Sequence, residues 1–189
     1  MPKIILRDRN AALVEEWRKH MPANYDIECG DIFSKPAACI VSPANSFGFM
    51  DGGVDLVLTK RFGWSIQDAV QRRIRDDFGG ELLVGQALTV ETDDDEFPIL
   101  ISAPTMRVNM RILDPQAVRL AARAAMREAV RIGADSIVSP GMGTGCGAVK
   151  PGWAAQLMAA GFADALGPKM FPKSLHVAHE DHHRPYPKA

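Results

Sequence analysis

Short apolar runs alternate along the chain with segments in which apolar residues recur every three or four positions. The runs predict strands at 3–7, 25–29, 38–42, 87–92, 99–103 and 136–139, and the longer segments predict helices at 11–20, 54–61, 65–78, 114–132 and 150–166. Strands that alternate with helices indicate an α/β fold in which helices cover both faces of one sheet. The acidic turn at 93–96 predicts a hairpin-like pair between 87–92 and 99–103.

Clear signals mark both ends of the longest predicted helix. Asp114 is a typical N-cap residue, Pro115 suits the first helical position, and Gly133 ends the pattern. After Gly167 the chain becomes rich in Pro and His. We therefore expect one domain at 1–167, followed at 168–189 by a segment whose order the composition leaves open.

Net charge, apolar runs and cysteine content limit the kinds of partner and the cellular compartment that we expect. The 189 residues carry a net charge of −1, which disfavours, without excluding, nucleic acid and gives no reason to expect an anionic membrane. The N-terminus lacks the apolar core of a signal peptide, and no apolar run is long enough to span a bilayer. Cys29, Cys39 and Cys146 are odd in number and widely spaced, as expected of reduced thiols in a cytoplasmic protein.

Two glycine-containing loops each follow a predicted strand and lead into a predicted helix. The first occupies 43–55 and the second 140–147. Glycine permits positive φ and allows backbone N–H groups to approach a ligand, and a helix N-terminus adds partial positive charge. Ligands of such folds bind beyond the carboxyl ends of the strands, where both loops are expected. The pattern predicts a nucleotide-diphosphate site.

Four blocks in order resemble the macrodomain family, which binds ADP-ribose. They are Gly30-Asp31-Ile32, Ser42-Pro43-Ala44-Asn45, Gly52-Gly53-Val54-Asp55 and Pro140-Gly141-Met142-Gly143-Thr144-Gly145-Cys146-Gly147. The resemblance covers about residues 25–165. It implies a single-domain, three-layer α/β/α fold with a mixed sheet, and ADP-ribose or an ADP-ribosylated macromolecule as the partner.

The resemblance also implies a role for each matching residue. Asp31 accepts a hydrogen bond from the adenine amino group with help from the Ile32 backbone, and Asn45 contacts the distal ribose. Asp55 follows Asn45 by ten residues, the spacing of members that hydrolyse ADP-ribose from carboxylates, so Asn45 and Asp55 are the candidate catalytic pair. The remaining candidate ligand-binding residues are Ala44, Met50, Asp51, Gly52, Gly53, Val54, Gly141, Met142, Gly143, Thr144, Gly145, Cys146 and Gly147.

Three features depart from the family pattern. Met50-Asp51 replaces part of the usual glycine run, and the Asp51 carboxylate would repel a diphosphate unless it points to solvent. Ser42 replaces the first asparagine of its block. The family's final strand often supplies an aromatic residue near the adenine or the distal ribose. The corresponding region here, 174–179, offers no residue to which that role is assigned.

Each candidate residue also has a plainer structural interpretation. Asp31 is suited to capping a turn, Asn45 to satisfying backbone groups in a tight turn, and Asp55 to stabilising a helix N-terminus. Cys146, near a helix N-terminus, is either a reactive thiol or a small loop residue. These alternatives stay open at the level of sequence.

Two clusters outside the loops suggest further chemistry. Arg119, Arg123, Arg127 and Arg131 form a helical stripe, which is either a surface for an anionic polymer or a solvated face. His176, His179, His182 and His183 have spacings compatible with a metal site, but the surrounding Pro-rich segment favours a tail without one.

The sequence therefore predicts hydrolysis of an ADP-ribosyl ester, on a carboxylate side chain or in an O-acyl-ADP-ribose, without metal or cofactor. The alternative within the family is a reader that binds free or protein-linked ADP-ribose without chemistry. An α/β phosphatase or other nucleotide-processing protein is a further alternative. It is weakened because the sequence has no Cys-x₅-Arg loop and no Gly-Lys-Ser/Thr phosphate loop.

Overall fold

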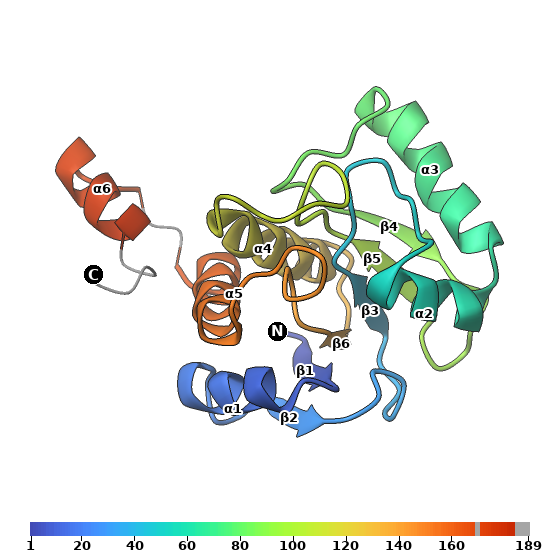
Figure 1. Ribbon diagram of the computed structural model, residues 1–189, viewed down its shortest axis with the longest axis horizontal. Helices are drawn as coiled ribbons and strands as arrows, with labels where there is room; N and C mark the ends of the chain where they lie inside the picture. Colours follow the sequence, from blue (N-terminus) through green and yellow to red (C-terminus); the bar gives the residue numbers. More distant parts are fainter. Residues whose placement is uncertain (169–170, 184–189) are drawn as a thin grey trace.

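A computed structural model shows one six-stranded sheet between two layers of helices (Figure 1). It describes residues 1–168 and 171–183. In chain order the elements are β1 (Lys3–Asp8), α1 (Ala11–His20), β2 (Asp26–Cys29), β3 (Cys39–Ser42), α2 (Gly53–Phe62), α3 (Ser65–Phe78), β4 (Leu88–Glu91), β5 (Ile99–Ser102), α4 (Gln116–Arg131), β6 (Ser136–Ser139), α5 (Pro151–Leu166) and α6 (Leu175–His183). The predicted strands and helices up to 166 are confirmed, with bounds that shift by a few residues at most.

The sheet is mixed, as predicted, and its order is β2-β1-β6-β3-β5-β4. All neighbouring strands run parallel except β4, which is antiparallel to β5. The antiparallel pair is the one predicted around the acidic turn, with Val90 opposite Leu100. The carboxyl ends of β1, β3, β5 and β6 consequently meet at one edge of the sheet, beside the two glycine loops.

Alternate residues of the central strands point into two separate cores. Ile4, Leu6, Cys39, Val41 and Ile137 pack with α1, α4 and α5, whereas Ile5, Ile40, Leu100 and Val138 pack with α2 and α3. Near-continuous apolar strands of this kind are expected when both faces of a parallel sheet are covered. Because both faces of each central strand are buried, the strand is apolar at consecutive positions and appears in the sequence as a short apolar run.

Helix starts follow local capping chemistry. Asn10 caps α1 by accepting hydrogen bonds from the N–H groups of Ala12 and Leu13. The Asp114 carboxylate accepts from the N–H of Gln116 at 3.0 Å, at the start of α4. The predicted N-cap is confirmed for α1, whereas the N-cap of α4 is Pro115, one residue after the predicted Asp114.

The segment after Gly167 contains helix α6, on the α4–α5 side of the molecule (Figure 1). Arg119 of α4 forms an ion pair with Asp181, and the Gln116 amide donates to the carbonyl of His182. The implied final strand at 174–179 is therefore wrong, since Ser174 precedes a helix and its side chain accepts from the N–H of Val177. Residues 169–170 and 184–189 of the predicted C-terminal segment lie outside the described residues.

Candidate functional site

A cleft of about 560 Å³ opens at the edge of the sheet where the parallel strands end. It is lined by the end of β1, by the connections that follow β1, β2, β3, β5 and β6, and by the first turns of α2. They contribute Arg7–Asn10, Gly30–Ile32, Pro43, Ala44, Phe49, Gly52–Asp55, Val57, Thr105, Met106, Asn109, Pro140, Gly141 and Gly143–Gly147. The two glycine loops thus lie on one cleft, as the sequence predicted from the strand ends.

Most of the candidate residues line this cleft. They are Asp31, Ile32, Ala44, Gly52, Gly53, Val54, Asp55, Gly141, Gly143, Thr144, Gly145, Cys146 and Gly147. Four others do not: Met50 and Met142 are buried in the cores, Asn45 is buried beneath the first loop, and Asp51 is exposed. Asp51 is not among the residues that line the cleft, although its negative charge lies close enough to act on Asp55.

Asn45 uses its whole amide to hold the first loop. Its Oδ1 accepts from the N–H groups of Phe47 and Phe49, each at 3.2 Å. Its Nδ2 donates to the carbonyl of Phe49 at 2.8 Å and to Oδ1 of Asn109 at 3.3 Å. This geometry favours the turn-stabilising interpretation of Asn45, and it leaves Phe49 and Asn109 as the neighbours that reach the cleft.

The rest of the first loop is fixed from beneath. The N–H of Met50 donates to Oε1 of Gln67 at 2.8 Å, and the Thr59 hydroxyl donates to the Met50 carbonyl at 3.0 Å. Gly48 has φ +68°, and a Cβ there would meet Val70 at 2.7 Å. The loop is therefore preorganised before any ligand arrives, which lowers the entropic cost of binding.

Asp55 is the chemically distinctive residue of the cleft. It lies in the first turn of α2, is 7% exposed, and accepts a hydrogen bond from the Ser42 hydroxyl at 2.5 Å. Burial raises the pKa of this carboxyl to about 6, against the lowering effect of the Ser42 hydrogen bond and with a small contribution from the negative charge of Asp51. A carboxyl that titrates near 6 is suited to accept a proton at neutral pH.

The second loop is shaped by contacts with the protein itself. The N–H of Gly141 donates to Oδ2 of Asp8 at 2.9 Å. Gly143 has φ +74°, and a Cβ there would meet Val118 at 2.8 Å. At Gly147 a Cβ would meet the carbonyl of Gly143 at 2.6 Å. These glycines are required by the path of the chain.

At Gly52 and Gly145, neither the backbone conformation nor the space around the residue requires glycine. Neither has positive φ, and a Cβ at either would meet nothing within 4 Å. Both line the cleft. The side chains missing at these two positions leave room for something else to approach the backbone, as close approach by a ligand requires.

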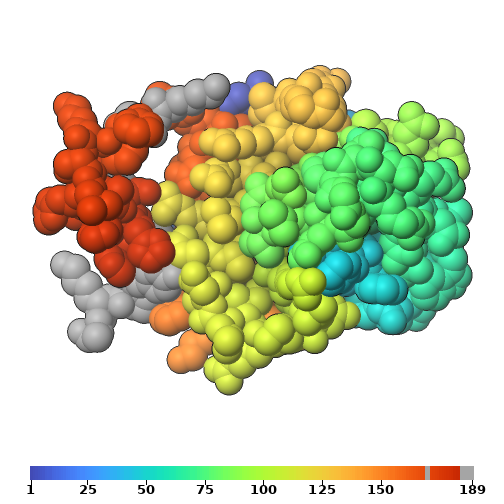
Figure 2. Space-filling model, turned by 90° about the horizontal axis from the view of Figure 1, so that it is seen from above, coloured from blue at the N-terminus to red at the C-terminus, as the bar shows by residue number. Residues whose placement is uncertain are grey.

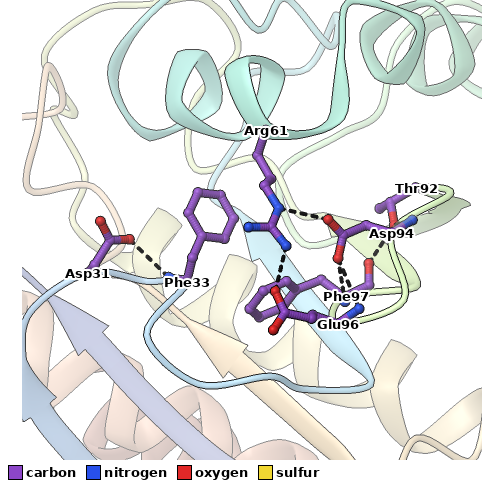
Figure 3. Close-up of polar contacts among 7 residues, drawn as sticks. All are labelled: Asp31, Phe33, Arg61, Thr92, Asp94, Glu96 and Phe97. Carbon is purple, nitrogen blue, oxygen red and sulfur yellow. Dashed lines mark hydrogen bonds and ion pairs between the residues drawn. The ribbon is translucent and has the colours of Figure 1, made fainter.

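The adenine candidate Asp31 is held from two sides. Its Oδ1 accepts from the N–H of Phe33 at 3.0 Å (Figure 3), and its Oδ2 accepts from Nη2 of Arg9 at 2.6 Å. The Phe33 hydrogen bond, followed by Arg9, lowers the pKa of this carboxyl. Asp31 therefore both caps a turn, as in the plainer interpretation, and presents an anionic acceptor to the cleft.

A cation and two aromatic rings anchor the far side of this turn. Figure 3 shows Arg61 of α2 between Phe33 and the acidic turn that joins β4 to β5. Its guanidinium lies 5.4 Å from the Phe33 ring centroid and 5.8 Å from that of Phe97. It also pairs with Asp94 at 2.7 Å and Glu96 at 2.6 Å. The acidic turn thus has a structural use that its sequence alone did not reveal.

The basic side chains among the residues that line the cleft are Arg7 and Arg9. Arg7 is 1% exposed, and its guanidinium is paired with Asp26 at 2.7 Å and Glu28 at 3.1 Å. The Arg9 side chain is 77% exposed and pairs only with Asp31 among the ion pairs described. Arg9 is therefore the basic side chain most available to a ligand.

Sequence reasoning missed the contributions of β1 and β5. Arg7 and Asp8 end β1 and are followed by Arg9 and Asn10, and Thr105, Met106 and Asn109 follow β5. Neither segment contains glycine, so the motif used to find the loops did not reveal them. Parallel pairing of β3 with β5 places Thr105 beside Ala44, to whose carbonyl it donates at 3.0 Å. The rule that parallel strands end at one edge was the signal available for both.

The structure bears on the two clusters outside the loops, the arginine stripe and the histidine cluster. Arg119 pairs with Asp164 and Asp181, and Arg131 pairs with Glu128, so the arginine stripe does not form one continuous free basic face. Within residues 1–168 and 171–183, no group of three or more His, Cys, Asp and Glu side chains is arranged to hold a metal ion. In the same residues no helix has the length and apolar character needed to cross a membrane.

Comparison with known proteins agrees with this architecture. A family model, Macro domain, matches residues 41–158, and the chain therefore belongs to the macrodomain family. An uncharacterized protein of Aquifex aeolicus is 35% identical over 130 residues, which cover 68% of this chain and 74% of the relative.

Two solved structures with low identity show the same fold. The macrodomain of Mycobacterium tuberculosis DarG has a TM-score of 0.62 at 19% identity, covering 71% of this chain and 87% of that one. A mutant macrodomain of Oceanobacillus iheyensis with ADPR also has a TM-score of 0.62 at 20% identity, covering 70% of this chain and 72% of that one.

Proposed function

We propose that the protein binds ADP-ribose in the 560 Å³ cleft and hydrolyses ADP-ribosyl esters there. The observation that carries the proposal is Asp55: a buried carboxyl in the cleft wall, with its pKa raised to about 6, beside two loops that leave backbone open at Gly52 and Gly145. Family membership supports ADP-ribose as the ligand, as does the neighbouring O. iheyensis structure with ADPR.

The proposed pose runs from Asp31 to Asp55. The adenine amino group donates to the Asp31 carboxylate, and the diphosphate lies between the open backbone at Gly52 and Gly145. The distal ribose lies near Phe49 and Asn109, so that Asn45 acts on it through the loop and through its hydrogen bond to Asn109. The partner is free ADP-ribose or an ADP-ribosylated macromolecule, and the free cysteines support a reducing, cytoplasmic compartment.

In the proposed reaction, Asp55 accepts a proton from a water that attacks either the anomeric carbon or the acyl carbonyl. The ester C–O bond breaks, and the products are ADP-ribose and a carboxylic acid. Ser42 keeps Oδ1 of Asp55 fixed, which leaves the other oxygen for the water. General-base assistance of this kind is typically worth about 10²–10⁴-fold. No step requires a metal or a cofactor.

Release of ADP-ribose from a glutamate-linked mono-ADP-ribosylated protein tests the proposal. Wild-type protein should release ADP-ribose, and Asp55→Asn should lower the rate by about 10²-fold or more. Asp68→Asn, which changes an exposed carboxyl of α3 outside the cleft, is the matched control and should stay close to wild type. Binding without release from any ester would instead establish the reader, for which the fully used amide of Asn45 is the supporting observation.

A further inference from the structure

A second hollow of about 320 Å³ adjoins the cleft on the side of the connection between β5 and α4. Thr105 and Met106 line both spaces. Met106 also pairs with Asn45 in an isolated bridge, which places this shared wall at the distal-ribose end of the proposed pose. In that pose, a group attached to the distal ribose would lie at the entrance of the second hollow.

The second hollow is walled mainly by apolar side chains, which we call the apolar groove. It is defined by Val84, Met106, Met110, Ile112, Leu113 and Leu120. Met110 is 49% exposed and Leu113 is 84% exposed, and the adjacent Leu83 and Val108 are exposed as well. A contiguous patch of exposed apolar side chains on a protein surface marks a binding site for a ligand or a partner.

The apolar groove and the cleft also share direct packing contacts. A Cβ at Gly143 or Gly147 would meet Ile112 at 3.0 Å and 2.7 Å, so Ile112 packs directly on the second loop. The Ile112 N–H donates to the Gly147 carbonyl at 2.9 Å. In Figure 2 the lime surface around residue 110 lies between the yellow surface of α4 and the cyan surface of the first loop.

Of the polar residues that line the second hollow, Thr105, Arg107 and Asp114 have partners within the protein, and Arg111 is exposed to solvent. Arg107 is paired with Glu81 at 2.8 Å and lies over the Phe47 ring at 4.9 Å. The Asp114 carboxylate accepts from the N–H of Gln116. A peptide in the groove would turn part of its backbone N–H and C=O groups toward apolar side chains, which offer these groups no hydrogen-bond partner. A hydrocarbon chain needs none.

We propose that the apolar groove binds the acyl chain of an O-acyl-ADP-ribose whose chain is longer than acetyl. The inference rests on the proposed function and names its substrate class. Water adds to the acyl carbonyl, the bond from that carbon to the ribose oxygen breaks, and the water proton passes through Asp55 to the ribose oxygen. The products are ADP-ribose and a free fatty acid of the same chain length.

A series of O-acetyl-, O-butyryl- and O-octanoyl-ADP-ribose tests the inference with the full-length protein. We expect kcat/KM to rise at least about tenfold from acetyl to octanoyl, and Kd to fall in parallel. This is well short of full burial of the added methylenes, because the groove is open to solvent. Equal kcat/KM and equal Kd across the series would overturn the inference.

Two variants localise the effect. Met110→Lys places a charge in the groove, and Ala117→Phe fills it from the first turn of α4, since Ala117 also lines the hollow. Each should reduce the octanoyl-to-acetyl ratio of kcat/KM to near one. Val130→Lys, at an exposed apolar position at the other end of α4, is the control and should keep the wild-type ratio.

The outcomes separate this inference from the proposed function. If the protein binds ADP-ribose but hydrolyses no ester, the hydrolase proposal fails. The dependence of Kd on chain length then tests by itself whether the groove binds the acyl chain. If acetyl and octanoyl esters are hydrolysed equally while the groove variants impair only an ADP-ribosylated peptide, the groove binds peptide and the acyl inference is wrong. A ratio that persists in both groove variants also contradicts it.

Discussion

The Ser42 hydroxyl donates a hydrogen bond of 2.5 Å to Oδ1 of Asp55, and this contact joins the end of β3 to the first turn of α2. It fixes the orientation of a carboxyl that is 7% exposed and whose pKa burial raises to about 6. Two elements that converge at the edge of the sheet thus hold this buried carboxyl in the cleft wall.

The pH dependence of hydrolysis should report this carboxyl. A base must be deprotonated to accept a proton, so kcat/KM should rise through a pH near 6 and level off above it. The measurement is a pH–rate profile with a carboxylate-linked substrate between pH 4.5 and 8.5. A rate that is flat across pH 6 would remove Asp55 as the base.

Asp55 should also cost stability at neutral pH. Its folded-state pKa, about 6, exceeds the ordinary value of 3.8, so its stabilising contribution is present below about pH 4 and is lost as pH rises through 6. Asp55→Asn should therefore raise the melting temperature at pH 8, and the gain should vanish near pH 4.

A matched variant separates this effect from helix capping. Asp68 is the exposed first-turn acid of α3, and Asp68→Asn should lower stability at pH 8 by about 0.3–1 kcal/mol through loss of the helix-dipole interaction. If Asp55→Asn is destabilising at pH 8 like Asp68→Asn, Asp55 is a cap and the raised pKa is not the dominant effect.

Asp31 should determine the preference for adenine. Asp31→Ala loses a charge-assisted hydrogen bond worth about 1.5–3 kcal/mol, so affinity for ADP-ribose should fall by at least about tenfold. Discrimination against the inosine analogue, which lacks the amino group, should shrink in the same variant. Glu15→Ala, which removes an exposed acid of α1 outside the cleft, should change neither quantity in a calorimetric titration.

Two glycines of the second loop should respond in opposite ways to a side chain. At Gly145 a Cβ meets nothing within 4 Å, whereas at Gly143 it meets Val118 at 2.8 Å and φ is +74°. Gly145→Val should keep the wild-type melting temperature and weaken ADP-ribose binding by about tenfold or more. Gly143→Val should lower the melting temperature. Tight binding by a stably folded Gly145→Val protein would contradict the proposed path of the diphosphate.

The fold followed from the sequence because local signals agreed with the final packing. Residues such as Ile40 and Val41 alternate between two apolar cores, so a short apolar run was sufficient to identify a strand. The acidic turn predicted the one antiparallel pair. The 174–179 region was misjudged because family resemblance implied a strand, whereas Ser174 caps a helix that contacts α4.

The candidate site was only partly predictable, for reasons of distance in sequence. Glycine motifs identified the two loops but carried no information on Arg9 or Thr105, which reach the cleft through strand pairing. The burial of Asn45 also depends on tertiary contacts, since its amide is used by Phe47, Phe49 and Asn109. Packing between distant segments therefore decided which matched residues face the ligand space.

The most direct test of the account is calorimetric titration of the wild-type protein with ADP-ribose and, separately, with AMP. The account predicts micromolar or tighter binding of ADP-ribose, about −8 kcal/mol, and weaker binding of AMP, because AMP lacks the second phosphate and the distal ribose. Absence of heat with ADP-ribose, confirmed by unchanged NMR chemical shifts of the glycines in the two loops, would contradict the account.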